Sequence, residues 1–388
     1  MIRSSRQRLG CTVVLLALVG LAACSDGGAA PTTDPPAAVT TTTGTGSSTT
    51  VVLADDTARA AASAALFSAI TPDQPGCTYA VSRDGQVVWA QAYGAANLNP
   101  LTPLSTDSIV DIGSTSKQFT GTAVALLIEQ GKLDLADAVG HYLPSLPSWA
   151  QTVTVGDLVH HTSGIPDYVD LLLNGGATLT SVTTEADALR VLTAVASLEF
   201  APGDHFEYSN SNYFLLGEVV AKVTGGPLGS FVQREIFDPL GLHAVMDPTA
   251  KLPTKAVSYT KISGKWIVND SPWTQVGDGG VQATPTDLVT WAAQYWAPTI
   301  GNADINTLRM DGAAVDPQSG GRYGFGIGQL SVGDLQVLSH GGSWGGFVTT
   351  FIVAPDLHLA VAGTCTSPDS VPKTTSGDPG LELLQIWR

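Results

Sequence analysis

Apolar residues alternate with polar ones, or run continuously, at both ends of the folded part of the chain. Two β-rich runs, 77–83 and 86–90, flank Asp84-Gly85, a dipeptide that favours a tight hairpin. Near the other end, further runs have strand patterns and are separated by short turns: 323–330, 335–340, 347–353 and 359–364. We therefore expect strands from both ends of the chain.

Helical periodicity dominates the region between these strands. Phe119, Ala123 and Leu127 recur at helical spacing within 115–130, and Gly131 is placed to end that helix. Other windows also have helical patterns: 55–70, 186–196, 213–222 and 286–296. This order predicts a mixed α/β (α+β) fold with one sheet built from both chain ends, and a mostly helical subdomain inserted at about 133–297.

The first residues of the chain are typical of an export signal. Arginines precede an apolar run from Cys11 to Ala23, which is shorter than the roughly 20 residues that span a bilayer. The string Leu21-Ala-Ala-Cys24 is similar to the lipobox of bacterial lipoproteins, in which the cut falls before a cysteine that is then acylated. We expect residues 1–23 to be a signal peptide and Cys24 to carry a lipid anchor at the cell envelope. The alternative is a plain signal peptide in which Cys24 is incidental.

Residues 24–54 are almost entirely small or polar, a composition that cannot offset the entropy of ordering. We interpret them as a disordered tether and residues 55–388 as the folded domain. The chain has 34 acidic and 18 basic side chains, a formal net charge of −16. This charge argues against nucleic acid and anionic membrane surfaces as partners, so membrane contact is expected only through the lipid anchor.

Ser-x-x-Lys occurs three times in the chain, at Ser114/Lys117, Ser258/Lys261 and Ser370/Lys373. Ser258 lies in a hairpin pattern and Ser370 lies between prolines, whereas Ser114 follows Gly113 and opens a predicted helix. Three residues are nearly one helical turn, so Ser114 and Lys117 share a face and can form a hydrogen bond. We predict Ser114 as a nucleophile, Lys117 as a candidate base, and the Ser114 N–H as a donor to a developing oxyanion.

Tyr208-Ser-Asn210 is the only Tyr-x-Asn string in the chain. It lies on a predicted loop, where catalytic groups are often displayed. A phenol beside a lysine ammonium has its ionised form favoured, so Tyr208 is a second candidate for the general base. Asn210 is a candidate for binding a substrate amide or carbonyl.

His340-Gly341-Gly342 ends a strand pattern, and Ser343 follows. Glycines at this place let a substrate lie close against the strand, with the Ser343 N–H as the second oxyanion donor. The same region fits Gly-x-Ser-x-Gly, but that elbow needs a helix after the serine, and a strand pattern follows instead. His160-His161 is not spaced like a helical zinc pair, so we expect no metal site.

The ordered set Ser114-x-x-Lys117, Tyr208-x-Asn210 and His340-Gly-Gly342 resembles the serine β-lactamase and penicillin-recognising enzyme superfamily. It is most similar to the branch that holds class C β-lactamases, D-alanyl-D-alanine carboxypeptidases and β-lactamase-like esterases. Further strings that resemble this branch are Leu158-Val-His-His-Thr-Ser-Gly-Ile-Pro-Asp167, the segments 202–210 and 237–242, and Gly279-Gly280 leading into Thr286-Asp287. The similarity runs from about residue 55 to near the C-terminus.

The resemblance implies a mechanism, a fold and a disulfide. Ser114 would attack an ester or amide carbonyl, Lys117 or Tyr208 would take its proton, and water would hydrolyse the acyl-enzyme with no cofactor. The sheet would be antiparallel and flanked by helices, with its first and last strands as neighbours. Cys77 begins the first of these strands and Cys365 follows the last, so the two could form a disulfide in an oxidising compartment.

The third motif departs from the family pattern. Class C β-lactamases typically have Lys-Thr-Gly there, and some carboxypeptidases have His-Thr-Gly. Here Gly341 removes a hydroxyl that would help to hold a substrate carboxylate, and His340 is expected to be only partly charged near neutral pH. We therefore expect an esterase, or a D-amino-acid peptidase or carboxypeptidase, that acts on a small-molecule or peptide substrate. The alternatives are a β-lactamase and a catalytically weak, envelope-anchored penicillin-binding protein.

Overall fold

The computed structural model describes residues 56–388 of the chain. The predicted signal peptide, the tether and the lipidation at Cys24 lie outside the described residues. Within residues 56–388, no helix combines the length and the apolar character that crossing a membrane requires.

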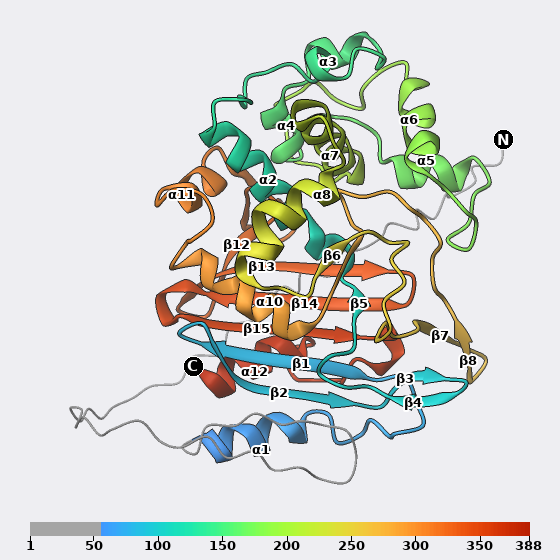
Figure 1. Ribbon diagram of the computed structural model, residues 1–388, viewed down its shortest axis with the longest axis vertical. Coiled ribbons are helices and arrows are strands. Elements are labelled where there is room, and N and C mark those ends of the chain that lie inside the picture. The colour runs from blue at the N-terminus through green and yellow to red at the C-terminus, as the bar shows by residue number, and fades with distance from the viewer. Residues whose placement is uncertain (1–55) are drawn as a thin grey trace, which may run out of the picture.

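An eight-stranded antiparallel sheet crosses the lower half of the molecule (Figure 1). From one edge to the other its strands are β10 (Ala314–Val315), β11 (Arg322–Tyr323), β12 (Gly328–Val332), β13 (Leu335–Trp344), β14 (Phe347–Ala354), β15 (Leu359–Cys365), β1 (Cys77–Arg83) and β2 (Gln86–Tyr93). β1 pairs with β15 along its whole length, from Cys77 opposite Cys365 to Arg83 opposite Leu359. The sheet is therefore built from both chain ends, which confirms the prediction.

Helices lie on both faces of this sheet and above it. α10 (Pro285–Trp291) and α12 (Pro379–Trp387) pack on strands of the sheet, and α1 (Thr57–Ala65) packs against α12. The others are α2 (Lys117–Glu129), α3 (Val139–Tyr142), α4 (Val155–Val159), α5 (Tyr168–Asn174), α6 (Glu185–Thr193), α7 (Asn210–Thr224), α8 (Leu228–Val232), α9 (Asp238–Leu240) and α11 (Ile305–Met310). In Figure 1, α3 to α7 form a group above the sheet. α10 falls in the range expected for the helical insertion, but it packs on β1, β2 and β15.

Small sheets accompany the large one in the described part of the chain. They are formed by β3 (Ala95–Leu98) with β4 (Leu101–Pro103), by β5 (Val110–Asp111), β9 (Val281–Ala283) and β6 (Val245–Met246), and by β7 (Tyr259–Ile262) with β8 (Lys265–Val268). The last pair is the hairpin predicted around Ser258.

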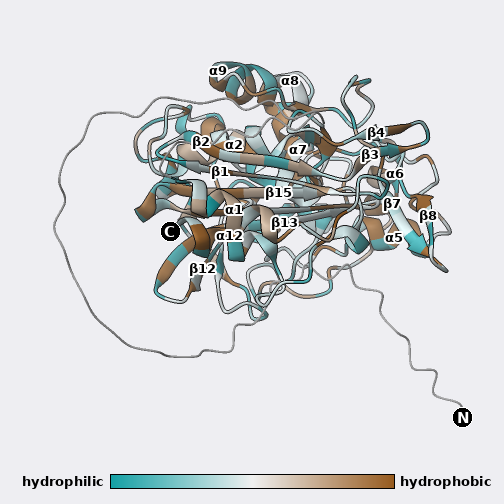
Figure 2. Ribbon diagram, turned by 90° about the horizontal axis from the view of Figure 1, so that it is seen from below, coloured by the Kyte–Doolittle hydropathy of each residue, from teal (hydrophilic) through white to brown (hydrophobic). Residues whose placement is uncertain are grey.

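Apolar cores lie on both faces of the large sheet. Phe67, Trp89 and Trp387 are fully buried on the side of α1 and α12, whereas Phe119 and Trp291 are buried on the side of the helical group. The central strands β1 and β15 are buried almost throughout because both of their faces are covered. Figure 2 shows the molecule from below, coloured by the hydropathy of each residue.

The helix predicted over 55–70 is shorter in the structure. α1 ends at Ala65, and the N–H groups of Leu66 and Phe67 donate to carbonyls three residues back, at 3.2 and 3.1 Å. These tight turns place the ring of Phe67 against Tyr79, with the ring centroids 4.8 Å apart. The α-helix therefore ends at Ala65 because the hydrogen bonds that follow span three residues instead of four, a change that helical periodicity in the sequence does not show.

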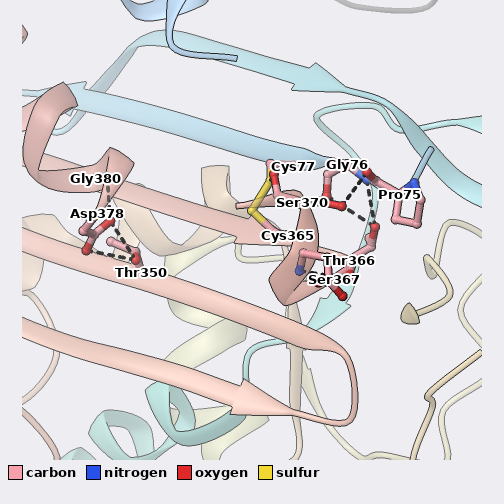
Figure 3. The surroundings of a disulfide bond; sticks show 11 residues. Pro75, Gly76, Cys77, Thr350, Cys365, Thr366, Ser367, Ser370, Asp378 and Gly380 are labelled. Carbon is pink, nitrogen blue, oxygen red and sulfur yellow. Dashed lines mark hydrogen bonds between the residues drawn. A yellow bond between two sulfur atoms is a disulfide. The ribbon is translucent and has the colours of Figure 1, made fainter. Parts of the chain in front are cut away.

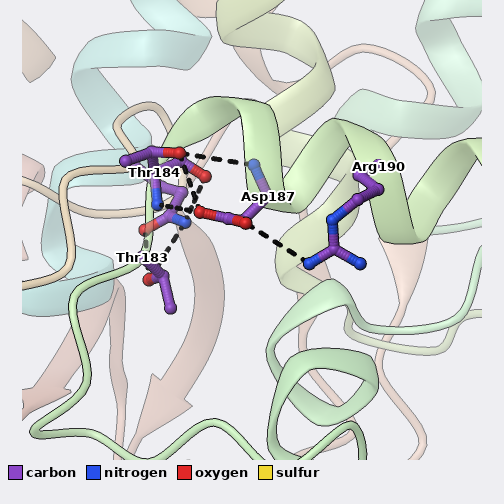
Figure 4. A network of polar contacts seen from close by, with 5 residues as sticks. Thr183, Thr184, Asp187 and Arg190 are labelled. Atoms are coloured by element: carbon purple, nitrogen blue, oxygen red, sulfur yellow. Dashed lines mark hydrogen bonds and ion pairs between the residues drawn. The ribbon is translucent and has the colours of Figure 1, made fainter.

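Capping boxes fix where several helices begin. At the start of α6, the Thr184 N–H and hydroxyl both donate to Asp187 Oδ2, and the Asp187 N–H donates back to the Thr184 hydroxyl (Figure 4). The same arrangement begins α4 at Thr154 and α10 at Thr284. Each box satisfies N–H groups that the helix itself leaves without acceptors.

The single strand predicted over 323–330 is wrong, because the structure divides it into β11 and β12. The intervening loop packs on the start of α2, and Gly326 has a positive φ of 76°. A Cβ atom at Gly326 would lie 2.3 Å from the carbonyl carbon of Lys117. Only glycine allows this backbone-to-backbone contact, so tertiary packing rather than the local apolar pattern interrupts the strand.

A disulfide joins Cys77 to Cys365 across the β1–β15 pair, with a Cα–Cα distance of 4.0 Å (Figure 3). Hydrogen bonds beside it also link the two chain ends, from the Gly76 N–H to Thr366 Oγ1 at 3.0 Å and from Ser370 Oγ to the Pro75 carbonyl at 2.6 Å. The covalent bond thus lies where the first and last strands of the sheet meet.

Removing this cross-link should destabilise the protein. The bond closes a loop between residues 288 positions apart, so Cys77→Ala/Cys365→Ala should lower the free energy of unfolding by about 2–5 kcal/mol. Urea unfolding of the non-reduced proteins measures the difference. Wild type treated with a reductant is the control, because it separates loss of the bond from loss of side-chain volume. An unchanged unfolding midpoint in the double variant would contradict the prediction.

Candidate active site

Ser114 lies in a 3-10 turn, Gly113–Ser116, that leads directly into α2. The sequence predicted an ordinary helix start at this place, and the structure has a tighter one. In a 3-10 helix, side chains three residues apart eclipse each other. Lys117 therefore lies directly over Ser114, and its Nζ donates to Ser114 Oγ at 3.1 Å.

Lys117 is completely buried and makes hydrogen bonds to two other segments of the chain. Its Nζ donates to Asn210 Oδ1 at 2.8 Å and to the carbonyl oxygen of Asp278 at 2.7 Å. The ammonium also lies 4.9 Å from the ring centroid of Tyr208 and 5.9 Å from that of Tyr213. These contacts compensate the loss of water around a buried amine.

The 3-10 turn packs against the backbone of β13. A Cβ atom at Gly342 would lie 1.9 Å from the carbonyl oxygen of Ile112, and one at Gly113 would lie 2.7 Å from the Ser343 nitrogen. The register of β12 with β13 ends at Ser339, so the last part of β13 has no β12 partner. The structure thus brings Ser114 beside the open part of β13 and the Ser343 nitrogen, the second predicted oxyanion donor.

Tyr208 lies in the site, but the prediction that its ionised form is favoured is wrong. Burial raises the pKa of the phenol well above 10, and the nearby Ser114 hydroxyl opposes this shift only in part. The Tyr208 hydroxyl is buried, and the Ser114 hydroxyl is its hydrogen-bonding neighbour. Tyr208 is therefore a neutral phenol whose O–H is available for hydrogen bonding beside the nucleophile.

His161 supports Tyr208, a role that the sequence did not indicate. Its ring stacks on Tyr208 with centroids 4.4 Å apart, and its Nδ1 accepts from the Ser209 N–H at 3.2 Å. The Asn212 amide lies 2.9 Å from the same nitrogen. Because Nδ1 accepts, the proton of the neutral ring is on Nε2, and burial lowers the pKa of His161 well below 6.5. In the sequence, His161 belonged to the family-like string 158–167 and to the doublet His160-His161, which was considered only for metal binding, so it had no assigned role.

Asn210 is the first residue of α7, and both ends of its amide are bonded within the protein. Its backbone N–H and its Nδ2 each donate to Asp167 Oδ2 at 2.9 Å, while Oδ1 accepts from Lys117. The carboxylate thereby fixes the amide with its oxygen toward the lysine. Burial raises the pKa of Asp167 from 3.8 to about 6, and the hydrogen bonds from Asn210 and Val169 oppose that shift. Asp167 stood at the end of a string that resembled the family, without an assigned role.

The Asp278 carbonyl is presented by a glycine-rich turn. Gly277 has a φ of 106°, and a Cβ atom there would lie 2.5 Å from the Tyr213 carbonyl oxygen. The Asp278 side chain accepts from the Tyr168 hydroxyl at 3.0 Å. The sequence analysis singled out the neighbouring glycines 279 and 280 and missed Asp278. Every residue has a backbone carbonyl, so the residue type does not show which carbonyl accepts the hydrogen bond from Lys117.

His340 is buried, and the prediction that it is partly charged near neutral pH is wrong. Burial and the charge of Lys117 lower its pKa to about 3. Its Nδ1 lies 2.6 Å from the Gly341 carbonyl oxygen, which can only accept, so Nδ1 carries the proton. Its Nε2 then accepts from the Tyr323 hydroxyl at 2.9 Å. His340 is a neutral group held by Tyr323.

Gly341 has open space beside it. The nearest heavy atom to a Cβ built there would be the Thr349 carbonyl oxygen, at 3.8 Å. A side chain would fit at this position, whereas Gly342 must be glycine because of its contact with Ile112. The two glycines of the motif therefore differ: one is required by packing and the other is not.

The other serines that were considered as nucleophiles lie in the local structures expected from their sequence context. Ser343 lies within β13, and β14 rather than a helix follows it, so there is no nucleophile elbow. Ser258 immediately precedes the β7–β8 hairpin, and Ser370 ends a 3-10 turn. Among residues 56–388, no group of three or more His, Cys, Asp or Glu side chains is placed to hold a metal ion.

Asp167 makes the site sensitive to pH. Its ionised oxygen accepts two hydrogen bonds from Asn210, and protonation would remove this acceptor, so hydrolysis of a p-nitrophenyl ester should fall as the pH drops through about 6. Asp167→Asn places an amide N–H₂, or an oxygen that is a weaker acceptor than a carboxylate, against Asn210, and should therefore lower kcat by about tenfold. Because the variant has no carboxylate to protonate, its kcat should no longer fall as the pH drops through about 6. The dependence of kcat on pH measures both effects.

Unfolding of the protein in acid is another way to lose activity, but protonation of Asp167 would not cause it. Because the pKa of Asp167 is raised, its stabilising contribution is present below pH 3.8 and is lost as the pH rises through about 6, so acidification does not unfold the protein through this group. Asp170→Asn, which changes an exposed carboxylate on α5, is the matched control: it should keep the loss of activity in acid but move it slightly to lower pH, because the Asp170 charge helps to raise the pKa of Asp167. An acid limb that persists in Asp167→Asn would contradict the assignment.

Known proteins resemble this chain along most of its length. It is 29% identical over 278 residues to the D-aminopeptidase of Brucella anthropi, an alignment that covers 70% of this chain and 52% of that protein. It is 26% identical over 298 residues to penicillin-binding protein 4* of Bacillus subtilis (strain 168), covering 71% of this chain and 64% of that protein. The chain therefore spans between half and two thirds of the length of these relatives.

Solved structures share the fold. The octameric penicillin-binding protein homologue from Pyrococcus abyssi superimposes with a TM-score of 0.71 and 26% sequence identity, over 80% of this chain and 73% of that one. Residues 38–384 match the model of the family described as Beta-lactamase, and this range includes every residue of the site. The chain belongs to the Beta-lactamase family.

Proposed function

We propose that this protein is a serine hydrolase that forms an acyl-enzyme on Ser114 with esters, or with amides that have no carboxylate next to the scissile bond. The proposed substrate class rests on the state of two residues, His340 and Gly341. His340 is neutral and bonded to Tyr323, and Gly341 has no side chain, so this part of β13 offers neither a cation nor a hydroxyl to a substrate carboxylate. Substrates without a carboxylate at this place therefore fit such a wall better than anionic ones.

The contacts of Lys117 support it as the base. Asn210 Oδ1 and the Asp278 carbonyl can only accept, so they bind two N–H groups of the amine in either charge state. Ser114 Oγ can donate as well as accept, so a neutral Lys117 can turn its lone pair toward the Ser114 O–H and take the proton during attack. Tyr208, with its raised pKa, does not suit this role.

Tyr208 and the backbone N–H groups would complete the reaction. The Ser114 and Ser343 N–H groups are the proposed donors to the oxyanion of the tetrahedral intermediate. The neutral Tyr208 hydroxyl, which lies beside the Ser114 hydroxyl, would relay the proton of Lys117 to the leaving oxygen or nitrogen. Water would then take the place of the leaving group and attack the acyl carbonyl. Its proton would pass through Tyr208 to Lys117 and from there to Ser114 Oγ, as the bond between the acyl carbon and Oγ breaks.

Amides of D-amino acids are the amide class that we favour. The relatives named D-aminopeptidase support this choice, since they align with most of the described chain. A second candidate, a penicillin-binding protein that is acylated slowly, is supported by the similarity to penicillin-binding protein 4*. The absence of a carboxylate-binding hydroxyl at Gly341 argues against it, and against efficient β-lactam hydrolysis.

We also propose that the protein is exported and anchored to the cell envelope through Cys24. The lipobox-like string before Cys24 supports this, as does the position of the family match, which begins at residue 38. The Cys77–Cys365 disulfide supports export independently, because such bonds persist mainly in oxidising compartments.

Turnover should depend on Ser114 and should favour substrates that have no carboxylate next to the scissile bond. Wild type should hydrolyse p-nitrophenyl esters and D-amino acid amides faster than nitrocefin or a D-Ala-D-Ala peptide, and Ser114→Ala should lower kcat/KM by at least about a thousandfold. Ser230→Ala, at an exposed serine on α8, is the control and should keep full activity. If no substrate shows Ser114-dependent turnover, the protein is a binding protein instead. If nitrocefin is the best substrate, the inference from Gly341 is wrong.

Installing the missing hydroxyl should change the preference. Gly341→Thr has room for its side chain, and a hydrogen bond to a carboxylate should raise kcat/KM for the D-Ala-D-Ala peptide about tenfold relative to the neutral ester. Gly341→Val is the matched control, since valine has the shape of threonine without its hydroxyl. An equal gain in both variants, or none in Gly341→Thr, would count against a role for this position in substrate choice.

A further inference from the structure

Within the described part of the chain, Arg309 on α11 is a buried cation without an anionic partner. Its residue exposure is 2%, and among residues 56–388 no carboxylate forms an ion pair with it. One nitrogen donates to the Tyr295 hydroxyl at 2.6 Å and another to Asn306 Oδ1 at 3.3 Å, while Nε is buried and has no hydrogen-bond partner in the same range. Burying a charge is costly unless it is paired, so this guanidinium has capacity for an anion.

The guanidinium is held rigidly. It lies 4.3 Å from the ring centroid of Tyr295 and 5.5 Å from that of Trp291, distances at which aromatic faces attract a cation. The Tyr295 hydroxyl in turn donates to Gln118 Oε1 at 2.9 Å, and the Arg309 carbonyl accepts from the Phe325 N–H at 2.9 Å. A donor that is fixed in advance loses little entropy when it binds a ligand.

Arg309 lines a cavity of about 340 Å³ that is separate from the candidate active site. The cavity lies between α11, the paired parts of β12 and β13, and the turn at Pro355, and none of Ser114, Lys117 or Tyr208 lines it. Ile327, Leu338 and Pro355 contribute apolar walls, while Asp356 lies at the exposed rim. Its volume lies at the lower end of the range of sites for small organic molecules.

We propose that this cavity binds a free α-amino acid with an apolar side chain. Its carboxylate would accept from Arg309, its side chain would pack on the apolar walls, and its ammonium would face Asp356. A simple anion would be repelled by Asp356, and a simple amine by Arg309, so a zwitterion matches both charges. The inference concerns a second site and does not depend on the hydrolase activity.

The test is isothermal titration of the whole protein with D- and L-leucine, which contain no bond for a hydrolase to cleave. At least one leucine enantiomer should bind in the millimolar range or tighter. 3-Methylbutylamine, which lacks the carboxylate, should bind at least about tenfold more weakly. If neither enantiomer binds at millimolar concentration, or if the amine binds as well as leucine, the proposal is wrong.

Variants place the binding in the cavity. Arg309→Met should abolish leucine binding, but it also changes a buried contact, so two variants at exposed rim positions decide the result. Asp356→Asn should weaken leucine about tenfold while strengthening 4-methylpentanoate, which lacks the ammonium. Gln336→Trp should block both by filling the entrance. Leucine binding that is unchanged in both rim variants would place it elsewhere and overturn the proposal.

Discussion

The buried amine of Lys117 is the interaction on which the rest of the site depends. A completely buried lysine is tolerated only if its N–H groups find acceptors, and here they come from the 3-10 turn at Ser114, the first residue of α7 and the turn at Asp278. These segments lie far apart in the sequence. Their common contact with one nitrogen therefore fixes the helical group against the element that carries the nucleophile.

Glycines make that arrangement possible by letting backbones approach closely. Gly326 contacts the backbone of Lys117 from the β11–β12 loop, and Gly342 contacts Ile112 from β13. A side chain at either position would move the 3-10 turn away from the sheet. Packing does not require glycine at position 341, because a Cβ atom there would have room. The residue at this position can therefore vary with the substrate.

Sequence patterns predicted the order of the helices and strands and the catalytic motifs. They did not predict the charge states of side chains whose pKa depends on burial. The sheet built from both chain ends, the helix after Ser114 and the exclusion of an elbow at Ser343 followed from periodicity and context. The charge states of Tyr208 and His340 did not, because the cost of removing a group from water depends on its neighbours in space. For the same reason, the pattern over 323–330 concealed a loop that packs on α2.

The sequence by itself determined that Ser114, Lys117 and Tyr208 occur in the order and local context of a Beta-lactamase family member, since hydroxyl, amine and phenol are properties of residue types. Only the tertiary structure decided what those groups can do. It oriented Asn210 through Asp167, assigned the protons of His161 and His340, and used the Asp278 backbone as an acceptor. These decisions arise from hydrogen-bond geometry and desolvation between distant segments, which no local pattern along the chain contains.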